Sequence, residues 1–444
     1  MLCKIFNIKR LSLCIIFYYC FLGLTLAESP NFPYSLKSIT SGPVALSLGG
    51  TSIANVYDPS AAIHNPANLV FNPQIQVTIS TYSAFHKETS DINDEHYSVF
   101  GTKNVNEFHL AYCGISYPFQ LFAMNMVAGV SYYPKFSFER SVVFNQKDDQ
   151  EMTDQRLWYL NQHGYMSAIS FSYGIQIYPQ FALGVNCNLW RDDLLDNQWK
   201  QDISMHGYRQ NGAVTFTEYQ NKTISNEDKG INLDFGLLWK IVPQLSAGVI
   251  FQTRRSNDIN CNISEQYGFD DGNIKPIMTN SPSIQRSDDI QIPMTLGLGL
   301  CYAMHDNWKM LMDFRQMYWE NFHYTTQQQN TTEFISGRSY DTHKKLRSHH
   351  LSMGSEYSFK ACILSLDSFF RMGFSICTDR GSVLPEPDSV FGMGFGLKGK
   401  QLDFNFGYQY QRYAQQEQAI TSDGILKSNI RNNVIELSIS YRIN

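Results

Sequence analysis

The 444-residue chain has few charged side chains and no large excess of either sign. Asp, Glu, Lys and Arg make up 17% of the residues, and the formal net charge is -5. Proteins that bind nucleic acid usually carry a clearly basic surface. This balance therefore gives no reason to expect nucleic acid as a partner.

The chain also lacks the motifs that mark common catalytic and metal sites. Its nine cysteines include no Cys-x-x-Cys pair, so neither zinc spacing nor dithiol redox spacing is present. No Gly-x-Ser-x-Gly, Walker or His-Glu-x-x-His sequence occurs. His349 and His350 are adjacent, and neighbouring strand residues point to opposite faces, so they do not form a metal site. We predict that the protein is not an enzyme and holds no cofactor or metal.

The mean hydropathy of the chain is low. The value of -0.28 excludes a bundle of membrane helices. Aromatic residues are nevertheless abundant, with 26 Tyr and 30 Phe. In a transmembrane β-barrel only alternate strand residues meet lipid, and aromatic girdles lie at both interfaces. The composition therefore favours such a barrel.

The first 27 residues have the pattern of an export signal. Lys4, Lys9 and Arg10 form a positive end, Leu11–Leu26 is apolar, and cleavage is expected after Ala27. The alternative is a retained membrane anchor. The apolar run is slightly shorter than the roughly 18 to 20 residues that a span needs, so we favour cleavage and export to a bacterial outer membrane.

From residue 74 onward the chain shows about fourteen segments of alternating apolar and polar residues, an even number, as bacterial barrels require. A period of two places one face against hydrocarbon and the other against water. The clearest apolar series are Ile231 to Trp239, Leu402 to Tyr410 and Ile435 to Ile443. The alternative is a soluble stack of β-sandwiches, which does not need outward aromatic residues on nearly every strand.

The connections between these segments alternate between short and long. Outer-membrane barrels have short periplasmic turns and long outward loops, whereas such loops are uncommon inside a soluble domain. The predicted short turns are Pro118–Gln120, Pro179–Gln180, Pro243–Gln244, His305–Asp306 and Lys398–Lys400. The predicted long loops include His86–Asn106, Asp193–Lys229 and Ser256–Asp288.

A segment rich in small residues, Ser41–Phe71, precedes the strands. Asp58 and Pro59 provide a helix cap followed by a proline at the first helical position. Asn65 is pushed out of the helical region by Pro66, so a helical turn ends there. We predict an all-β fold in which residues 28–72 form a plug inside a transmembrane antiparallel barrel of residues 73–444.

The plug segment resembles that of the FadL-like family of outer-membrane transporters for fatty acids and other hydrophobic compounds. PorV-like barrels of type IX secretion share the same signature. The resemblance lies in a glycine-rich run followed about fifteen residues later by Asn-Pro-Ala. Its motif residues are Gly49, Gly50, Asp58, Asn65, Pro66 and Ala67.

The resemblance implies a fourteen-stranded barrel whose ligand leaves sideways through a gap at a kink in the third strand. Here the third strand candidate, Leu121–Ser137, contains Gly129 and Pro134. Proline cannot donate a ladder hydrogen bond and so marks an edge, a bulge or a break. These two residues are candidates for a lateral opening, and the alternative is an ordinary strand end near the outer rim.

Several charged residues occupy the alternate strand positions that are predicted to face water. They either pair with one another and with the plug or line a polar path through which a plug rearrangement spreads. The set is Asp234, Asp313, Arg315, Glu356, Asp403, Glu436 and Arg442. Asp313 and Arg315 lie two apart on one strand and are predicted to hold the plug. The acidic run Glu88–Glu95 is either solvated or a calcium site.

The leading hypothesis is an outer-membrane channel for passive uptake of hydrophobic small molecules of the fatty-acid or hydrocarbon type. The alternative is a PorV-like barrel that docks or shuttles exported proteins at the cell surface. A barrel hydrolase lacks any supporting motif. Expected partners are outer-membrane lipid and lipopolysaccharide, a hydrophobic ligand, the barrel-assembly machinery and, for the alternative, secretion components.

Overall fold

The computed structural model describes residues 37–54, 60–93, 97–99, 102–148, 154–191, 198–211, 214–270, 277–280, 282–318, 321–325, 347–363, 365–378, 387–418 and 425–443. The predicted export signal and Asp58 of the plug motif lie outside these residues. No helix among them is long and apolar enough to cross a membrane.

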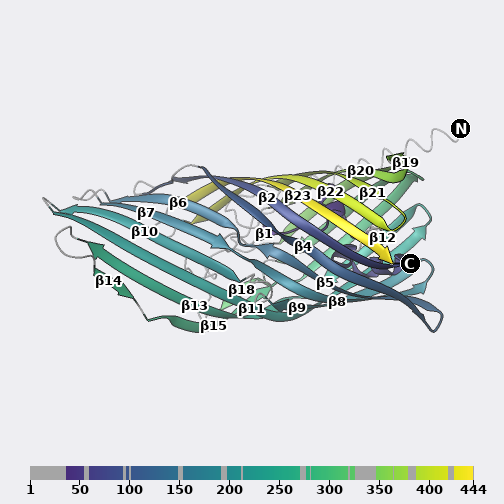
Figure 1. Ribbon diagram of the computed structural model, residues 1–444, viewed down its shortest axis with the longest axis horizontal. Coiled ribbons are helices and arrows are strands. Elements are labelled where there is room, and N and C mark those ends of the chain that lie inside the picture. Colours follow the sequence, from purple (N-terminus) through teal and green to yellow (C-terminus); the bar gives the residue numbers. More distant parts are fainter. Residues whose placement is uncertain are drawn as a thin grey trace.

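The protein is an all-β, closed antiparallel barrel of 14 strands, which confirms the predicted fold class. The last ring strand pairs with the first from Ile75 opposite Ile443 to Asn93 opposite Ile425, so the ring closes (Figure 1). In ring order the strands are β2 (Ile75–Asn93), β4 (Thr102–Leu121), β5 (Met124–Ser137), β8 (Tyr165–Tyr178), β9 (Phe181–Arg191), β11 (Val214–Val242), β12 (Leu245–Gln252), β16 (Thr295–His305), β17 (Trp308–Met317), β19 (Ser348–Ile363), β20 (Leu366–Thr378), β21 (Pro387–Lys398), β22 (Leu402–Gln418) and β23 (Ile425–Ile443).

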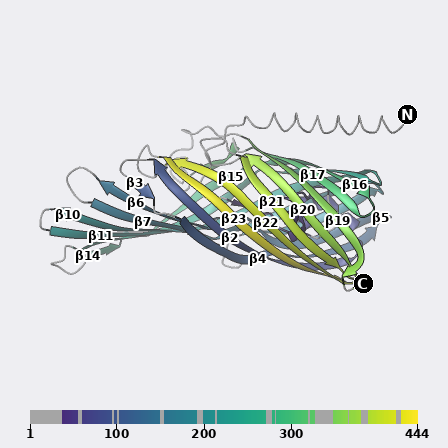
Figure 2. The same ribbon diagram turned by 90° about the horizontal axis from the view of Figure 1, so that it is seen from above.

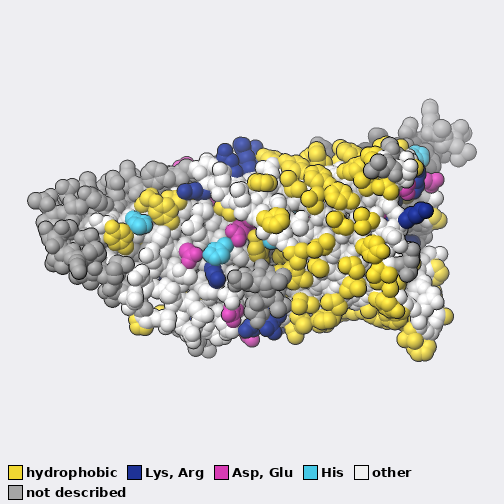
Figure 3. Space-filling model, viewed as in Figure 1, with side chains coloured by type: hydrophobic (Ala, Val, Ile, Leu, Met, Phe, Trp, Pro, Cys, Tyr) yellow, Lys and Arg dark blue, Asp and Glu magenta, His cyan; other side chains and the backbone are white. Residues whose placement is uncertain are grey.

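The outer wall carries an apolar belt near the end of the barrel that has the short turns (Figure 3). In β11, Ile231, Leu233 and Phe235 are exposed, whereas the intervening Asn232 and Asp234 are buried inside. In a hydrocarbon layer every backbone N–H and C=O group must be hydrogen-bonded within the protein, and a closed sheet meets this requirement. The belt therefore marks the height at which the barrel meets lipid.

Beyond the belt the same sheet continues as an extension, seen at the left of Figures 1 and 2, which we call the outer sheet. The first half of β11 belongs to this outer sheet and pairs with β10 and β13, and the second half belongs to the barrel and pairs with β9 and β12. The remaining strands of the outer sheet are β3 (Tyr97–Val99), β6 (Arg140–Asp148), β7 (Asp154–His163), β10 (Trp199–Asn211), β13 (Arg255–Asp270), β14 (Ile277–Asn280), β15 (Ile284–Ile292) and β18 (His323–Thr325).

The predicted long loops need correction. The range His86–Asn106 contains the end of β2, β3 and the start of β4. The ranges Asp193–Lys229 and Ser256–Asp288 contain β10, the first half of β11, and β13 to β15, not only connections. These strands were predicted as loops because their inward side chains are apolar at only a few positions, such as Ile259 and Ile290. Polar side chains cover much of both faces of the strands. A strand outside lipid does not need a continuous apolar face.

A further correction concerns the first short turn. It falls at Phe122 and Ala123, which have φ angles of 51° and 60°, and not at Pro118–Gln120. Pro118 lies inside β4, beyond the β2–β4 pairing, which begins at Gln76 and Ser116. Because β4 is an edge strand there, proline is tolerated in it.

The N-terminal segment lies within the ring and packs against the inner faces of the strands. Its elements are β1 (Lys37–Ser38), α2 (Pro43–Ser47), α3 (Ala61–His64) and the 3-10 helix η1 (Pro66–Phe71). Leu46, Leu48 and Ile53 have no exposed surface. This segment and the wall form the core, which fixes the geometry of the site described next.

Candidate functional site

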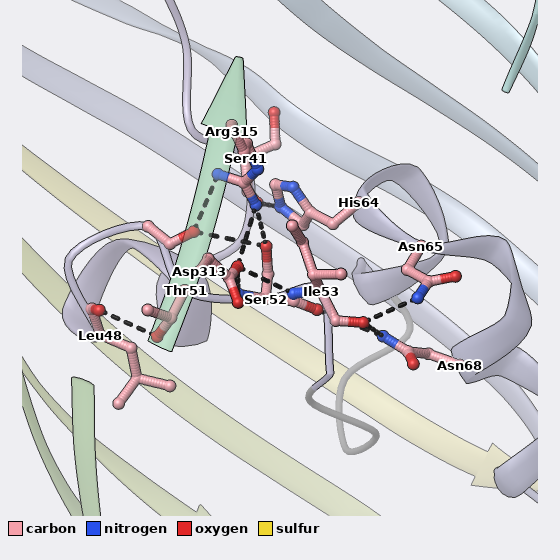
Figure 4. Close-up of polar contacts among 11 residues, drawn as sticks. Ser41, Leu48, Thr51, Ser52, Ile53, His64, Asn65, Asn68, Asp313 and Arg315 are labelled. Atoms are coloured by element: carbon pink, nitrogen blue, oxygen red, sulfur yellow. Dashed lines mark hydrogen bonds and ion pairs between the residues drawn. The ribbon is translucent and has the colours of Figure 1, made fainter. Parts of the chain in front are cut away.

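Asp313 and Arg315 of β17 bind the glycine-rich run of the N-terminal segment (Figure 4). Asp313 Oδ2 accepts hydrogen bonds from the backbone N–H groups of Ser52 (2.7 Å) and Ile53 (3.0 Å). Arg315 donates to the carbonyl of Gly50 (3.1 Å) and to Ser52 Oγ (2.7 Å). A buried charge is tolerated only when it is paired and hydrogen-bonded, and this arrangement meets that requirement for Asp313.

The Asn-Pro-Ala turn is fixed by the side chain of Asn65. Its Nδ2 donates to the carbonyls of Ile53 (2.7 Å) and of Leu237 on β11 (3.1 Å). Its Oδ1 accepts the N–H of Ala67 (3.1 Å) and so caps η1. One amide therefore joins the turn, the glycine-rich run and the barrel wall.

Glycines on the inner wall make this close approach possible. A Cβ added at Gly236 would lie 2.1 Å from Asn65 Oδ1, and one at Gly184 would lie 2.4 Å from the nitrogen of Ala67. Sequence reasoning placed no functional weight on Gly236. The available signal was a glycine in the middle of an apolar, otherwise regular strand, which often marks the close approach of another backbone.

The other predicted lumen charges divide into two groups. Glu436 Oε1 accepts the N–H of Gly42 (2.9 Å) and so contacts the N-terminal segment. The remaining members form bonds along the wall and its ends. These bonds are Asp234 with Asn188 and Gln252, Glu356 with Arg371 (2.7 Å), and Asp403 with Arg442 (2.8 Å).

His64 lies in α3 of the N-terminal segment, and Glu88 is placed differently from expectation. His64 Nε2 donates to the carbonyl of Ser41 (2.7 Å), within the N-terminal segment. Glu88 was predicted to lie in a solvated or calcium-binding run, and this is wrong. It is 2% exposed and accepts hydrogen bonds from Arg140 Nη2 (2.5 Å) and Nε (3.1 Å).

The barrel wall is split between β4 and β5. Their ladder runs from Leu121 and Met124 only as far as Cys113 and Tyr132. Above that rung β4 continues along β2, and β5 continues along β8 to Ser137. We call this divergence the seam.

The end of β5 turns into the barrel interior beside the seam. Tyr133, Phe136 and Phe138 are buried, which does not fit the alternating exposure of a wall strand. Gly129 lies below the seam, opposite Ser116, whereas Pro134 lies above it, next to a register shift in the β5–β8 ladder. Of the two lateral-opening candidates, only Pro134 is therefore at the divergence itself.

Side chains bridge the seam where the backbone ladder is missing. Ser137 Oγ donates to Glu107 Oε2 (3.1 Å). The ring of His109 on β4 lies 4.3 Å from that of Tyr165 on β8. Behind them, Ile63 of α3 packs in one cluster with Tyr112 and Tyr133. The seam is closed by side-chain contacts and not by backbone hydrogen bonds.

A cavity of about 40 Å³ lies beside the inward end of β5. Its lining combines aromatic side chains with Arg255, whose guanidinium is 3.7 Å from the ring centre of Trp190, a cation–π distance. The space is large enough for a few water molecules. Its lining also includes Tyr133, Lys135, Phe136, Asp234 and Met317.

A second cavity, of about 270 Å³, lies at the end of the barrel that has the short turns. Its lining is strongly charged and includes Lys309, Glu356, Lys360, Arg371 and Lys398. An apolar molecule gains nothing from such a lining, because the water around these charges would have to be displaced. Val44, Phe369 and Leu397 also line the second cavity, so the two cavities differ chiefly in the larger number of charged side chains around the second.

Comparison with known proteins places this geometry in a family. The family model BamG matches residues 8–357. The chain belongs to the BamG family. No curated protein matches the chain.

The solved structures that resemble this BamG-family chain are barrels of the FadL type. A Pseudomonas aeruginosa FadL homologue has 11% identity and a TM-score of 0.63, with 93% of this chain and 100% of that chain covered. The Pseudomonas putida toluene transporter TodX has 13% identity and a TM-score of 0.57, with 93% and 100% covered. The Ralstonia pickettii toluene transporter TbuX has 14% identity and a TM-score of 0.52, with 92% of this chain and 99% of that chain covered. At these identities the likeness shows the fold, and the predicted FadL-like barrel is confirmed.

Proposed function

We propose that this BamG-family barrel lies in the bacterial outer membrane and passively takes up small hydrophobic molecules. The observation that carries the proposal is the seam, because at the height of the apolar belt the β4–β5 ladder ends and side-chain contacts close the wall between these two strands. Phe108 and Ile115 of β4, on the outer face on either side of Cys113, are 74% and 47% exposed. A route through the wall at this height delivers an apolar molecule into lipid without crossing water.

The interior supports the same route. The buried cluster above the N-terminal segment consists of apolar side chains from β5, β8, β10, β13 and β15, and it borders the small cavity at Arg255. The opposite exit, toward the short turns, passes the charged cavity. We infer that a ligand enters from the extended end, displaces Phe136 or Met317, and leaves through the seam.

In this proposal residues 28–72 act as the plug, with 73–444 as the barrel. The part of the plug that shifts is the turn formed by Asn65, Pro66 and Ala67. The side chain of Asn65 ties η1 both to Ile53 and to the wall at Leu237, so breaking these two hydrogen bonds releases the turn from the wall. Gly49, Gly50 and the Asp313–Arg315 pair anchor the other end of the plug.

The test joins the two sides of the seam. In a variant without native cysteines, His109→Cys and Tyr165→Cys are connected by a short thiol crosslinker. The control connects Ser80→Cys and Ser438→Cys, which are opposite each other in the continuous β2–β23 ladder. In vesicles with a lipopolysaccharide outer leaflet, crosslinking the seam is expected to lower fatty-acid or toluene uptake at least tenfold. The control is expected to leave it unchanged. Uptake equal to that of empty vesicles in every variant rejects the channel.

The outer sheet and the family match favour a second function, docking of other proteins. The sheet extends beyond the apolar belt (Figures 1 and 3), and the family name, BamG, points to the barrel-assembly machinery. Under this proposal the protein co-purifies from native membranes with barrel-assembly or secretion components, and its depletion lowers the amount of other barrels. Solute flux without co-purification contradicts it.

A further inference from the structure

The short strand β1 occupies the edge of β5 that β4 leaves free. Lys37 lies opposite Ser137 and Ser38 opposite Phe136, and the N–H of Ile39 donates to the carbonyl of Lys135 (2.9 Å). The other edge of this part of β5 is paired with β8. A strand has only two edges, so β1 takes the ladder position that β4 holds farther down.

This ladder is too short to be stable alone, because strand pairing normally needs more rungs and a packed face. The side chain of Lys37 provides an additional attachment. Its Nζ donates to the carbonyl of Glu139 (2.5 Å) and lies 3.3 Å from His86 Nε2. Glu139 follows β5 in the chain, whereas His86 belongs to β2, which carries β4. Lys37 therefore connects the two sides of the seam.

Charged side chains surround Lys37 and come from β2, β4, the connection after β5, and β6. Glu88 on β2 and Glu107 on β4 attract the ammonium, and Glu139 adds a third carboxylate. Arg140 at the start of β6 repels it, but Arg140 is bound to Glu88. A neutral side chain at position 37 would leave Glu107 without its nearby cation, so the site favours a lysine or arginine.

We propose that β1 is a latch and that Lys37 fastens it, holding the end of β5 inward and the seam closed. When β1 leaves the edge of β5, Phe136 loses its rung opposite Ser38 and the end of β5 is free to move away from β4. This inference deepens the proposed uptake function, because it names what controls the exit.

The first test does not depend on transport. In a cysteine-free background, Phe136→Cys reports release of the latch, because Phe136 is 2% exposed. Lys37→Met is expected to raise its rate of modification by a membrane-impermeant maleimide at least tenfold, whereas Lys37→Arg leaves the rate low. Lys240→Met is the matched control, since Lys240 lies 3.7 Å from the ring centre of Phe71 in η1, far from β1 in the fold. Equal reactivity in Lys37→Met and Lys240→Met overturns the latch.

The second test keeps Lys37, and comparing the oxidised and reduced forms of the same variant separates the effect of the latch from any effect of the substitutions on folding. Ser38→Cys and Phe136→Cys are opposite residues of an antiparallel pair, at a separation that suits a disulfide. Oxidation is expected to abolish uptake and reduction to restore it, while protein with the Ser80→Cys and Ser438→Cys pair is insensitive to both. Increased maleimide reactivity without uptake in any variant supports the latch and rejects the channel. Uptake that is the same in both redox states supports the channel and rejects the latch.

Discussion

The carboxylate of Asp313 binds the backbone N–H of Ser52 at 2.7 Å, although 261 residues separate them in the chain. Asp313 is buried on the barrel wall, and Ser52 belongs to the segment inside the barrel. Removing the charge by Asp313→Asn weakens two hydrogen bonds and leaves Arg315 without its carboxylate. Bonds to charged groups contribute about 1.5–3 kcal/mol each. We expect the temperature at which the folded barrel is lost on semi-native gels to fall clearly.

The control for this variant is Lys360→Ala. Lys360 and Asp367 form an ion pair at 2.7 Å, but Lys360 is mostly exposed, and exposed pairs contribute about 0–1 kcal/mol. The gel transition should barely move. A transition that moves equally in both variants contradicts a specific role for Asp313.

Gly236→Ala tests the close approach of the Asn-Pro-Ala turn to the wall. The new Cβ would overlap Asn65 Oδ1, and overpacking of this kind typically costs about 1–3 kcal/mol. In an Asn65→Ala background the overlap disappears, so the same substitution should cost much less. The measurement is a double-mutant cycle on the free energy of unfolding in urea, where additive costs would show that the two residues do not interact.

Arg140→Met tests the buried pair beyond the apolar belt. It leaves the carboxylate of Glu88 buried and uncompensated, and breaking one partner of such a pair costs about 3–5 kcal/mol. Glu88→Gln combined with Arg140→Met removes both charges and should recover most of that loss. Protease digestion of the outer sheet in intact vesicles gives the readout. A double variant that is digested as fast as the single one argues against the pair.

Stability should depend on pH through Glu139, in the connection between β5 and β6. Burial raises the pKa of this carboxyl to about 7, the N–H of Gly164 lowers it, and Glu107 raises it while Lys37 lowers it. The folded state thus holds the proton more tightly than the unfolded state. This contribution to stability is present at low pH and is lost as pH rises through about 7. The unfolding temperature should fall between about pH 4.5, the ordinary pKa of a glutamate, and about pH 7 and then level off, and Glu139→Gln should flatten that fall.

The barrel was predictable because lipid imposes a strict rule on the sequence. Ile231, Leu233 and Phe235 alternate with polar residues over the whole belt, and this pattern identifies wall strands without knowledge of their partners. The turn at Asn65 and Pro66 was also predictable, because proline restricts the residue before it.

Pro134 pointed to the seam, but β1 and the outer sheet were not predictable, for the opposite reason. β1 has only two residues, so it leaves no periodic pattern, and its place is set by the edge of β5. The outer strands lie beyond the lipid belt, where polar residues on both faces carry no penalty. Glu88 was misplaced because its partner, Arg140, is 52 residues away and nothing in the local sequence indicates the pair.

Strand β11 runs through both the outer sheet and the barrel along one unbroken backbone, Val214–Val242. Its outer half holds β13, and its inner half offers the carbonyl of Leu237 to Asn65. One continuous strand therefore connects the outer strands to the turn at Asn65, so a shift of that strand along its length moves the acceptor of the Asn65 hydrogen bond as well.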